Sequence, residues 1–335
     1  MYGDPDTTWG ICLEARLADP VTLPEAVAGV AALCARFPHL GAAPLVEQRS
    51  AAQWSQTRQE VAATPYGPSS PLLRVVVSQD GCGLVVGAHH GVIDGLGLLA
   101  VAGAAVGRGL RTQARGIGDR AAPRGFLASS VRRLGEAVTD PPAHFEGTGE
   151  NSSRAEDLTA LTHPRVDRGT AHLARVVLAV HDVRRTRPGR RPVLVVGASR
   201  RVDELPLPDR QTAYLRLRVG PDTDRSRLTE AIAELRPEPD FPETSAGGVA
   251  PLAIRLLRGR LGATAMLSNL GRVDADGGGV LSLAMYPASS GPRSVAVGLA
   301  STATTTTLSL RTRRRDFSAA EHEALLGSLA DRFFG

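Results

Sequence analysis

The pattern of apolar positions near the start of the chain predicts a strand followed by a helix. Residues 9–17 form an apolar, strand-like run that ends before Asp19-Pro20. From 23 to 37 the apolar residues recur every three or four positions, which is the spacing of an amphipathic helix. Thr22 is placed to cap this helix and Pro38 to end it.

A hairpin is expected next, with a buried helix after it. A short helical or irregular piece at 51–63 precedes two Val-rich runs at 71–78 and 83–88. Asp80-Gly81 lies between these runs, and Asp-Gly suits the tight turn of a β-hairpin. The second strand leads directly into a pair of histidines, and the Leu- and Ala-rich stretch at 95–109 predicts a buried helix.

Apolar runs resume after a stretch at 116–168 that is rich in Pro, Gly and charged residues. The expected elements of this second half are an apolar segment at 171–183, strands at 192–197, 212–219, 280–286, 294–300 and 304–311, and a final helix from the Ser318 cap to 333. We therefore expect an N-terminal lobe over 1–140, a linker over 141–170 and a C-terminal lobe over 171–335.

Composition and charge narrow the class of protein. The 335 residues are 42% hydrophobic and 22% charged, which is ordinary for a packed globular chain. All 39 basic residues are Arg, a bias that fits a GC-rich genome, and the net charge is +5. The basic runs at 184–191 and 311–315 lack interleaved aromatic residues, so we expect no nucleic-acid partner. A carrier protein or a phosphate-bearing donor would use the same positive charge.

The cysteines and the apolar runs bear on the compartment. Cys12, Cys34 and Cys82 are odd in number and form no CxxC, so neither a disulfide framework nor a metal site is expected. The polar, acidic start is unlike a secretory signal, and no run reaches the ~20 apolar residues of a membrane span. A cytoplasmic protein without a membrane segment is the expectation.

One group of residues carries chemistry: His89-His90-Gly91-Val92-Ile93-Asp94-Gly95, between a predicted strand and a predicted helix. An imidazole with a pKa near ~6.5 can take a proton from an attacking hydroxyl or amine at neutral pH. Taken singly, a histidine pair in a strand is more often structural, and Asp-Gly is more often a turn.

The pattern HHxxxDG resembles the signature of the condensation-domain and chloramphenicol-acetyltransferase-like acyltransferase superfamily. Segments that resemble further landmarks of this superfamily follow in the same order, and they are Arg36-Phe37-Pro38-His39-Leu40, Pro71-Leu72-Leu73-Arg74, Ala198-Ser199-Arg200-Arg201 and Ser268-Asn269-Leu270-Gly271. The resemblance spans nearly the whole chain, which is markedly shorter than the usual member. It implies a two-lobed α/β fold in which each lobe is a mixed sheet with packed helices, arranged as a V around a central channel.

The resemblance also implies roles for the motif. His90 is the general base, and His89 points to the opposite side of the strand with a structural part. Asp94 turns away from the substrate to bond an Arg of the second lobe, with Arg201 as the first choice and Arg200 as the second. Gly95 lets the backbone approach the substrate channel closely.

Three further residues are candidates for the channel. Ser268 and Asn269 could donate hydrogen bonds to a carbonyl oxygen or a pantetheine arm, or could form a turn ahead of Gly271. Tyr286 lies where related acyltransferases bring a loop near the channel.

The function implied is acyl transfer in natural-product biosynthesis, with formation of an ester or an amide. The donor is a CoA thioester or the thioester of an acyl or peptidyl carrier protein that acts in trans, the acceptor is a small amine or alcohol, and no cofactor is bound. Two alternatives remain open: intramolecular cyclisation of a biosynthetic intermediate, and a non-catalytic protein that docks a carrier. Patterns for a serine hydrolase elbow, a P-loop or a dinucleotide fold are absent from the sequence.

Overall fold

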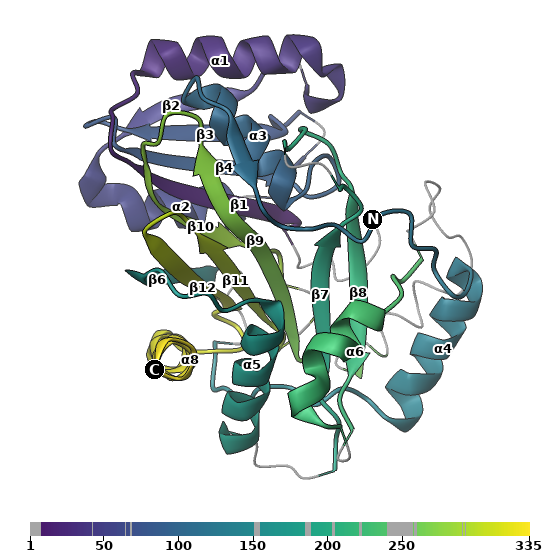
Figure 1. Cartoon of the computed structure of the whole chain (residues 1–335). Helices are drawn as coiled ribbons and strands as arrows, with labels where there is room; N and C mark the ends of the chain where they lie inside the picture. Colours follow the sequence, from purple (N-terminus) through teal and green to yellow (C-terminus); the bar gives the residue numbers. More distant parts are fainter. Residues whose placement is uncertain are drawn as a thin grey trace.

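The architecture is that of a computed structural model (Figure 1). It describes the chain except residues 1–7, 42, 64, 68, 151–154, 185–188, 203–204, 221–222, 240–256, 258–259, 290 and 292. Part of the first basic run predicted from the sequence, 185–188, therefore lies outside the described residues.

One mixed sheet forms the lobe that carries the histidine pair. In spatial order its strands are β10 (Val280–Tyr286), β1 (Gly10–Leu17), β4 (Gly83–His89), β3 (Leu73–Ser78) and β2 (Leu45–Arg49). The pair β2 and β3 is parallel, and the others are antiparallel. The predicted hairpin of β3 and β4 is confirmed, and β2 was not expected from the sequence.

A second mixed sheet forms the other lobe. In spatial order its strands are β6 (Glu156–Pro164), β12 (Thr305–Arg313), β11 (Val295–Ser301), β9 (Ala265–Ala275), β7 (Val193–Ser199) and β8 (Thr212–Arg218), with the short β5 (Leu110–Thr112) paired to the end of β9. The two-lobed α/β fold with a mixed sheet in each lobe is confirmed.

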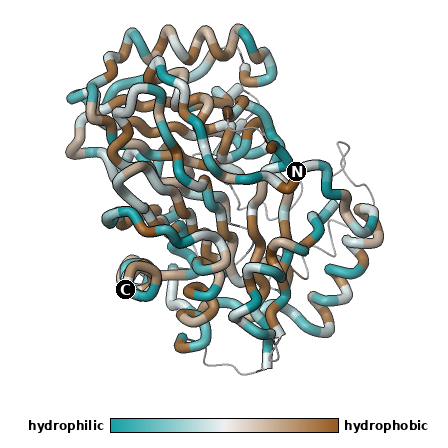
Figure 2. The backbone as a smooth tube through the Cα atoms, in the orientation of Figure 1, coloured by the Kyte–Doolittle hydropathy of each residue, from teal (hydrophilic) through white to brown (hydrophobic). Residues whose placement is uncertain are grey.

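Helices cover the outer faces of both sheets. In the first lobe α1 (Leu23–Arg36) and α3 (Gly95–Ala105) pack together over one face, and α2 (Trp54–Ala63) packs against the opposite face of β1 and β4. In the second lobe α5 (Thr170–Arg184), α6 (Leu228–Glu234) and α8 (Ala319–Phe334) pack beside one another around the core. Figure 2 shows hydrophobic residues recurring along the strands of both sheets, where these cores lie.

The capping residues behave as predicted. Thr22 accepts a hydrogen bond from the Glu25 amide and Ser318 from the Glu321 amide, and each glutamate carboxylate in turn accepts one from the backbone amide of the capping residue. Such reciprocal bonds satisfy amides that a helix start otherwise leaves unpaired.

The lobes do not follow the division predicted along the chain. Strand β10, from the predicted C-terminal lobe, pairs with β1 in the first sheet, because β9 runs on from the second sheet and delivers Leu270 and Val273 to the first core. The predicted linker 141–170 contains β6, which pairs with β12 along its whole length. In both places the pairing of strands that lie far apart in the sequence sets the boundary of a lobe, and the local sequence pattern does not predict it.

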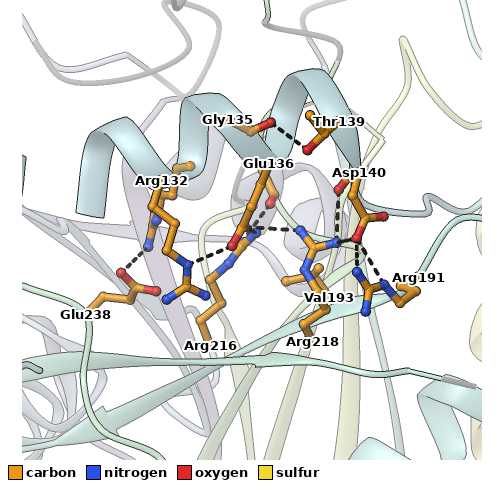
Figure 3. A network of polar contacts seen from close by, with 12 residues as sticks. Arg132, Gly135, Glu136, Thr139, Asp140, Arg191, Val193, Arg216, Arg218 and Glu238 are labelled. Atoms are coloured by element: carbon orange, nitrogen blue, oxygen red, sulfur yellow. Dashed lines mark hydrogen bonds and ion pairs between the residues drawn. The ribbon is translucent and has the colours of Figure 1, made fainter. Parts of the chain in front are cut away.

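A helix that was not fully predicted, α4 (Phe126–Thr139), is attached to the second sheet by ion pairs (Figure 3). The Glu136 carboxylate accepts from Arg216 and Arg218 of β8, at 3.1 Å each, and from Arg132 at 2.9 Å. Asp140, just after the helix, pairs with Arg191 and Arg218. The polar side of α4 thus faces the sheet, and its apolar residues Leu127 and Val131 are exposed.

A buried guanidinium joins the lobes at the start of β1. Arg311 of β12 is 1% exposed and forms an ion pair with Glu156, which is 3% exposed. Its Nη1 donates to the Gly10 carbonyl at 2.6 Å and its Nη2 to the Ala62 carbonyl at 3.2 Å. Gly10 pairs with His89 in the register of β1 and β4, so Arg311 fixes the strand end that leads into the motif.

We predict that Arg311→Met destabilises the protein by about 3–5 kcal/mol, because the buried Glu156 loses its close partner and keeps only the ion pair with Arg313 at 3.9 Å. The measurement is the free energy of unfolding by denaturant. The double variant Arg311→Met/Glu156→Gln should recover part of this loss. Full recovery would contradict a role for the hydrogen bonds to Gly10 and Ala62.

A second prediction concerns acid stability. Burial alone would raise the pKa of Glu136, but Arg216, Arg218 and Arg132 lower it to about 2. A carboxyl whose pKa is lower in the folded state stabilises the fold above its unfolded pKa of about 4.3, and this contribution is lost as the pH falls toward 2. Glu136→Gln should therefore lower the free energy of unfolding at pH 7 and flatten its decline between about pH 4.3 and 2. An unchanged pH dependence would argue against the network.

Candidate active site

His90 lies just beyond β4, where the two lobes meet. Its ring is partly buried, and each ring nitrogen takes part in one hydrogen bond. Nδ1 is 3.1 Å from the Ile93 carbonyl oxygen, three residues on. Nε2 is 2.8 Å from the hydroxyl of Tyr214, which belongs to β8 of the other lobe. His90 is thus held from its own turn on one side and from the second lobe on the other.

These partners determine the tautomer of the neutral ring. A carbonyl oxygen can only accept, so Nδ1 carries the proton and donates it to Ile93. Nε2 is then left with a lone pair, and the Tyr214 hydroxyl donates to it. The basic nitrogen of His90 therefore faces the lobe junction.

Electrostatics keep this ring neutral. Burial lowers the pKa of His90 below its ordinary value, and the hydrogen bond to Ile93 and the nearby Asp94 oppose this only in part. Arg210 and His89 add to the lowering. At neutral pH the lone pair on Nε2 is therefore present, as a general base requires.

His89 occupies a different environment. Its Nδ1 accepts a hydrogen bond from the Gly91 amide at 3.0 Å, and its ring packs edge-on against Tyr66 with the ring centroids 5.2 Å apart. Burial lowers its pKa as well. A side chain at Gly91 would collide with this ring, since its Cβ would lie 2.8 Å from Nδ1 of His89. These contacts favour a structural part for His89.

Asp94 is buried, at 3% exposed, and its carboxylate joins the two lobes. Oδ1 caps α3 by accepting from the Gly97 amide, and Oδ2 accepts from the Gln211 amide of the second lobe, both at 2.9 Å. The Asp94 amide in turn donates to the Asp209 carbonyl at 3.2 Å. The predicted attachment of Asp94 to the second lobe is found, but its partner is a backbone amide.

The expected arginine partners of Asp94 lie nearby with other contacts. Arg201, whose side chain is 8% exposed, forms an ion pair with Asp209. The Arg200 amide donates to the Gln211 carbonyl at 2.7 Å. In the described part of the chain no ion pair joins Asp94 to Arg201 or Arg200, and Arg201 is paired with Asp209 instead. The arginines hold the segment that Asp94 binds.

That segment, between β7 and β8, docks on the first lobe at two further points. Nε2 of His39 donates to the Pro208 carbonyl at 2.7 Å. Gly97 lies so close to this segment that a Cβ at position 97 would be 3.0 Å from the Asp209 carbonyl oxygen. A residue with a side chain would push the segment away, so Gly97 allows the contact that positions Tyr214.

Tyr214 is the site residue that the sequence did not reveal. The pattern of residues 212–219 predicts only a half-exposed strand, and nothing in the local sequence connects it with His90. Its ring stands edge-on to the His90 ring at 88°, with centroids 6.3 Å apart. Burial raises the pKa of Tyr214 to about 12, despite the nearby Arg210.

The remaining candidates take different places. Gly95 packs into the core, where a Cβ would lie 3.1 Å from Leu270 and 3.3 Å from Met285. Ser268 lies inside β9 and pairs with Gly197 of β7, which pairs in turn with Tyr214 of β8. Ser268 and Tyr214 therefore lie at the same level across these three strands. Asn269 bonds instead to the Thr170 hydroxyl and the Gly271 amide. The alternative of a turn is replaced by a bulged strand, with Gly271 at φ 70°.

Tyr286 is a core residue. It is fully buried on β10 beside Cys12, and its hydroxyl donates to Glu14 at 3.1 Å. Arg58 lies over its ring, with 5.5 Å from the guanidinium carbon to the centroid. Its hydrogen bond is used within the first lobe and gives no support to the expected place at the channel, which stays a prediction.

A pocket of about 460 Å³ lies away from His90, between α1, α3 and the start of β10. Its wall includes Arg108, which forms an ion pair with Asp19 at 2.9 Å. The predicted channel between the lobes stays a prediction.

Comparison with solved structures identifies the fold. The starter condensation domain of rhizomide synthetase, in complex with C8-CoA and Leu-SNAC, is 11% identical with a TM-score of 0.64, and the match covers 99% of this chain and 90% of that one. The first condensation domain of the calcium-dependent antibiotic synthetase, in complex with a substrate analogue, is 15% identical with a TM-score of 0.60 and coverages of 98% and 92%. This chain therefore has the condensation-domain fold.

Sequence comparison alone finds no match to a family model or to a curated protein. In the described residues, no helix combines the length and apolar character needed to cross a bilayer.

We predict that Asp94→Asn weakens the contact between the lobes, although the two side chains are nearly equal in size. The two carboxylate oxygens of Asp94 accept hydrogen bonds from two backbone N–H groups, but the side chain of Asn has only one oxygen. The side-chain nitrogen of Asn must therefore face the N–H group of Gly97 or of Gln211. The expected loss is about 1–3 kcal/mol in the free energy of unfolding. Asp209→Asn, which alters a more exposed carboxylate of the same junction, is the comparison. Equal stability of wild type and Asp94→Asn would contradict the bridging role.

Proposed function

We propose that this protein transfers an acyl group from a thioester to an amine or hydroxyl acceptor, with His90 as the general base. The observation that carries the proposal is the state of the His90 ring. Its Nδ1 proton is committed to Ile93, its Nε2 lone pair faces the lobe junction, and burial keeps it neutral. A neutral imidazole whose Nε2 lone pair lies at the lobe junction has the protonation state that a general base requires.

The step balances without a further reactant. The acceptor N–H or O–H loses its proton toward Nε2 while its heteroatom bonds to the thioester carbonyl carbon. The C–S bond then breaks, and the thiolate takes the proton from the imidazolium. The products are an amide or ester and a free thiol, with His90 returned to its starting state.

The class of donor is proposed from the structural neighbours. The rhizomide synthetase domain was crystallised with C8-CoA and Leu-SNAC, both thioesters. We propose a CoA thioester or a carrier-protein thioester acting in trans as donor for this chain, a small amine or alcohol as acceptor, and a place in natural-product biosynthesis. The thioester is a substrate, so the proposal needs no resident cofactor.

The test is intact-mass analysis of products from a panel of CoA and carrier thioesters with small amines and alcohols. We expect His90→Ala to lower the rate by about 10²–10⁴-fold, because the base is removed while the fold is kept. His163→Ala, which alters an exposed histidine on β6 that stacks on Phe334, is the control and should keep full activity.

Other outcomes separate the alternatives. Full activity of His90→Ala would exclude His90 as the base. A pathway intermediate that changes structure without any donor thioester would favour cyclisation. A carrier protein that binds without turnover would favour a docking protein.

A further inference from the structure

We propose that Tyr214 is a catalytic residue that relays the proton of the acceptor to His90. This inference rests on the acyl transfer proposed above and adds a second group, supplied by the other lobe. The acceptor would meet the Tyr214 hydroxyl and not the imidazole itself.

The first argument is the position of the hydroxyl. Oη of Tyr214 lies 2.8 Å from Nε2, on the only basic atom that the ring has left after Nδ1 bonds Ile93. A substrate that used Nε2 directly would have to displace this hydroxyl. A substrate that approaches the hydroxyl finds the route to the base already formed.

The second argument is the remaining capacity of the hydroxyl. A phenol donates one hydrogen bond and can accept others. Tyr214 spends its proton on His90, and among the described residues its oxygen has no other hydrogen-bond partner. The remaining lone pairs of Oη can accept a hydrogen bond but cannot donate one. They therefore favour a substrate that carries an N–H or O–H group.

The relay keeps atoms and charges in balance. As the heteroatom of the acceptor bonds to the thioester carbonyl carbon, its proton passes to Oη and the Tyr214 proton passes to Nε2. Collapse of the intermediate breaks the C–S bond, and the thiolate recovers a proton along the same route in reverse. Tyr214 is neutral before and after each transfer.

The surroundings suit a relay better than a phenolate. Burial raises the pKa of Tyr214 to about 12, so the hydroxyl stays protonated at neutral pH. Its proton is therefore exchanged together with the arrival of another, and no free phenolate needs to form.

The relay requires that both lobes be in place. His90 belongs to the first lobe and Tyr214 to β8 of the second, and the segment before β8 is fixed by the bonds between Asp94 and Gln211 and by the Arg201 and Asp209 ion pair. The proposal therefore gives the lobe junction a chemical role as well as a structural one.

The experiment compares Tyr214→Phe with wild type in the acyl-transfer assay. The variant keeps the ring and removes only the hydroxyl, and we expect kcat to fall by about 10²-fold or more with a much smaller change in KM. Tyr66→Phe is the matched control: Tyr66 packs on His89, and its hydroxyl has no hydrogen-bond partner among the residues that the structure describes, so activity should be unchanged. A Tyr214→Phe variant with wild-type or higher kcat overturns the relay and leaves His90 as a direct base.

The pH profile and the imidazole signals test the hydrogen bond from Tyr214 to His90, which the relay requires. The groups that face His90 are Tyr214, Asp94, Arg210 and His89. The Tyr214 hydroxyl donates to the neutral ring, so its removal should raise the pKa of His90 and move the acid limb of kcat/KM to higher pH. Nitrogen NMR of the His90 ring should show the same rise without any substrate.

The outcomes separate the two proposals. If wild type transfers no acyl group from any thioester, the proposed function fails and the relay with it. If wild type transfers, His90→Ala does not, and Tyr214→Phe changes neither kcat nor the nitrogen signals, only the relay fails.

Discussion

The carboxylate of Asp94 accepts one hydrogen bond from each lobe, and the geometry of the site depends on it. Oδ1 holds the start of α3, and Oδ2 holds Gln211 ahead of β8. Asp94 is only 3% exposed, so water competes little for its two carboxylate oxygens. Because His90 lies four residues before Asp94 and Tyr214 three residues after Gln211, this bridge brings the base and its partner into contact.

A second buried charge acts at the end of β1 and β4 that leads into the motif. Arg311 binds Glu156 within its own lobe and the Gly10 and Ala62 carbonyls of the other. Gly10 pairs with His89, so the strand that delivers the motif is fixed where it ends. Buried ion pairs contribute little net stability but are costly to break, which suits them to fixing one arrangement of two lobes.

The lobe junction also sets the chemical state of the histidine. Burial lowers the pKa of His90, the Ile93 carbonyl selects the tautomer, and Tyr214 occupies the basic nitrogen. Each effect comes from a different part of the chain: the packing of both lobes, the turn of the motif and β8. A free heptapeptide with the sequence of residues 89–95 would lack the burial and the contact with Tyr214. It would also be too flexible to hold the turn that brings the Ile93 carbonyl to Nδ1.

The sequence by itself determined the features that depend on near neighbours: the hairpin of β3 and β4, the capped helices α1 and α8, and the placing of a histidine pair between a strand and a helix. The resemblance to the acyltransferase superfamily implied that Asp94 would reach the second lobe. Only the tertiary structure decided that β10 joins the first sheet, that β6 lies within the supposed linker, that Arg311 and Arg313 of an arginine run are buried, and that Tyr214, 124 residues from His90, bonds the base. The physical reason is that periodicity and capping act within a few residues, whereas strand pairing and burial join segments whose separation along the chain carries no local signal.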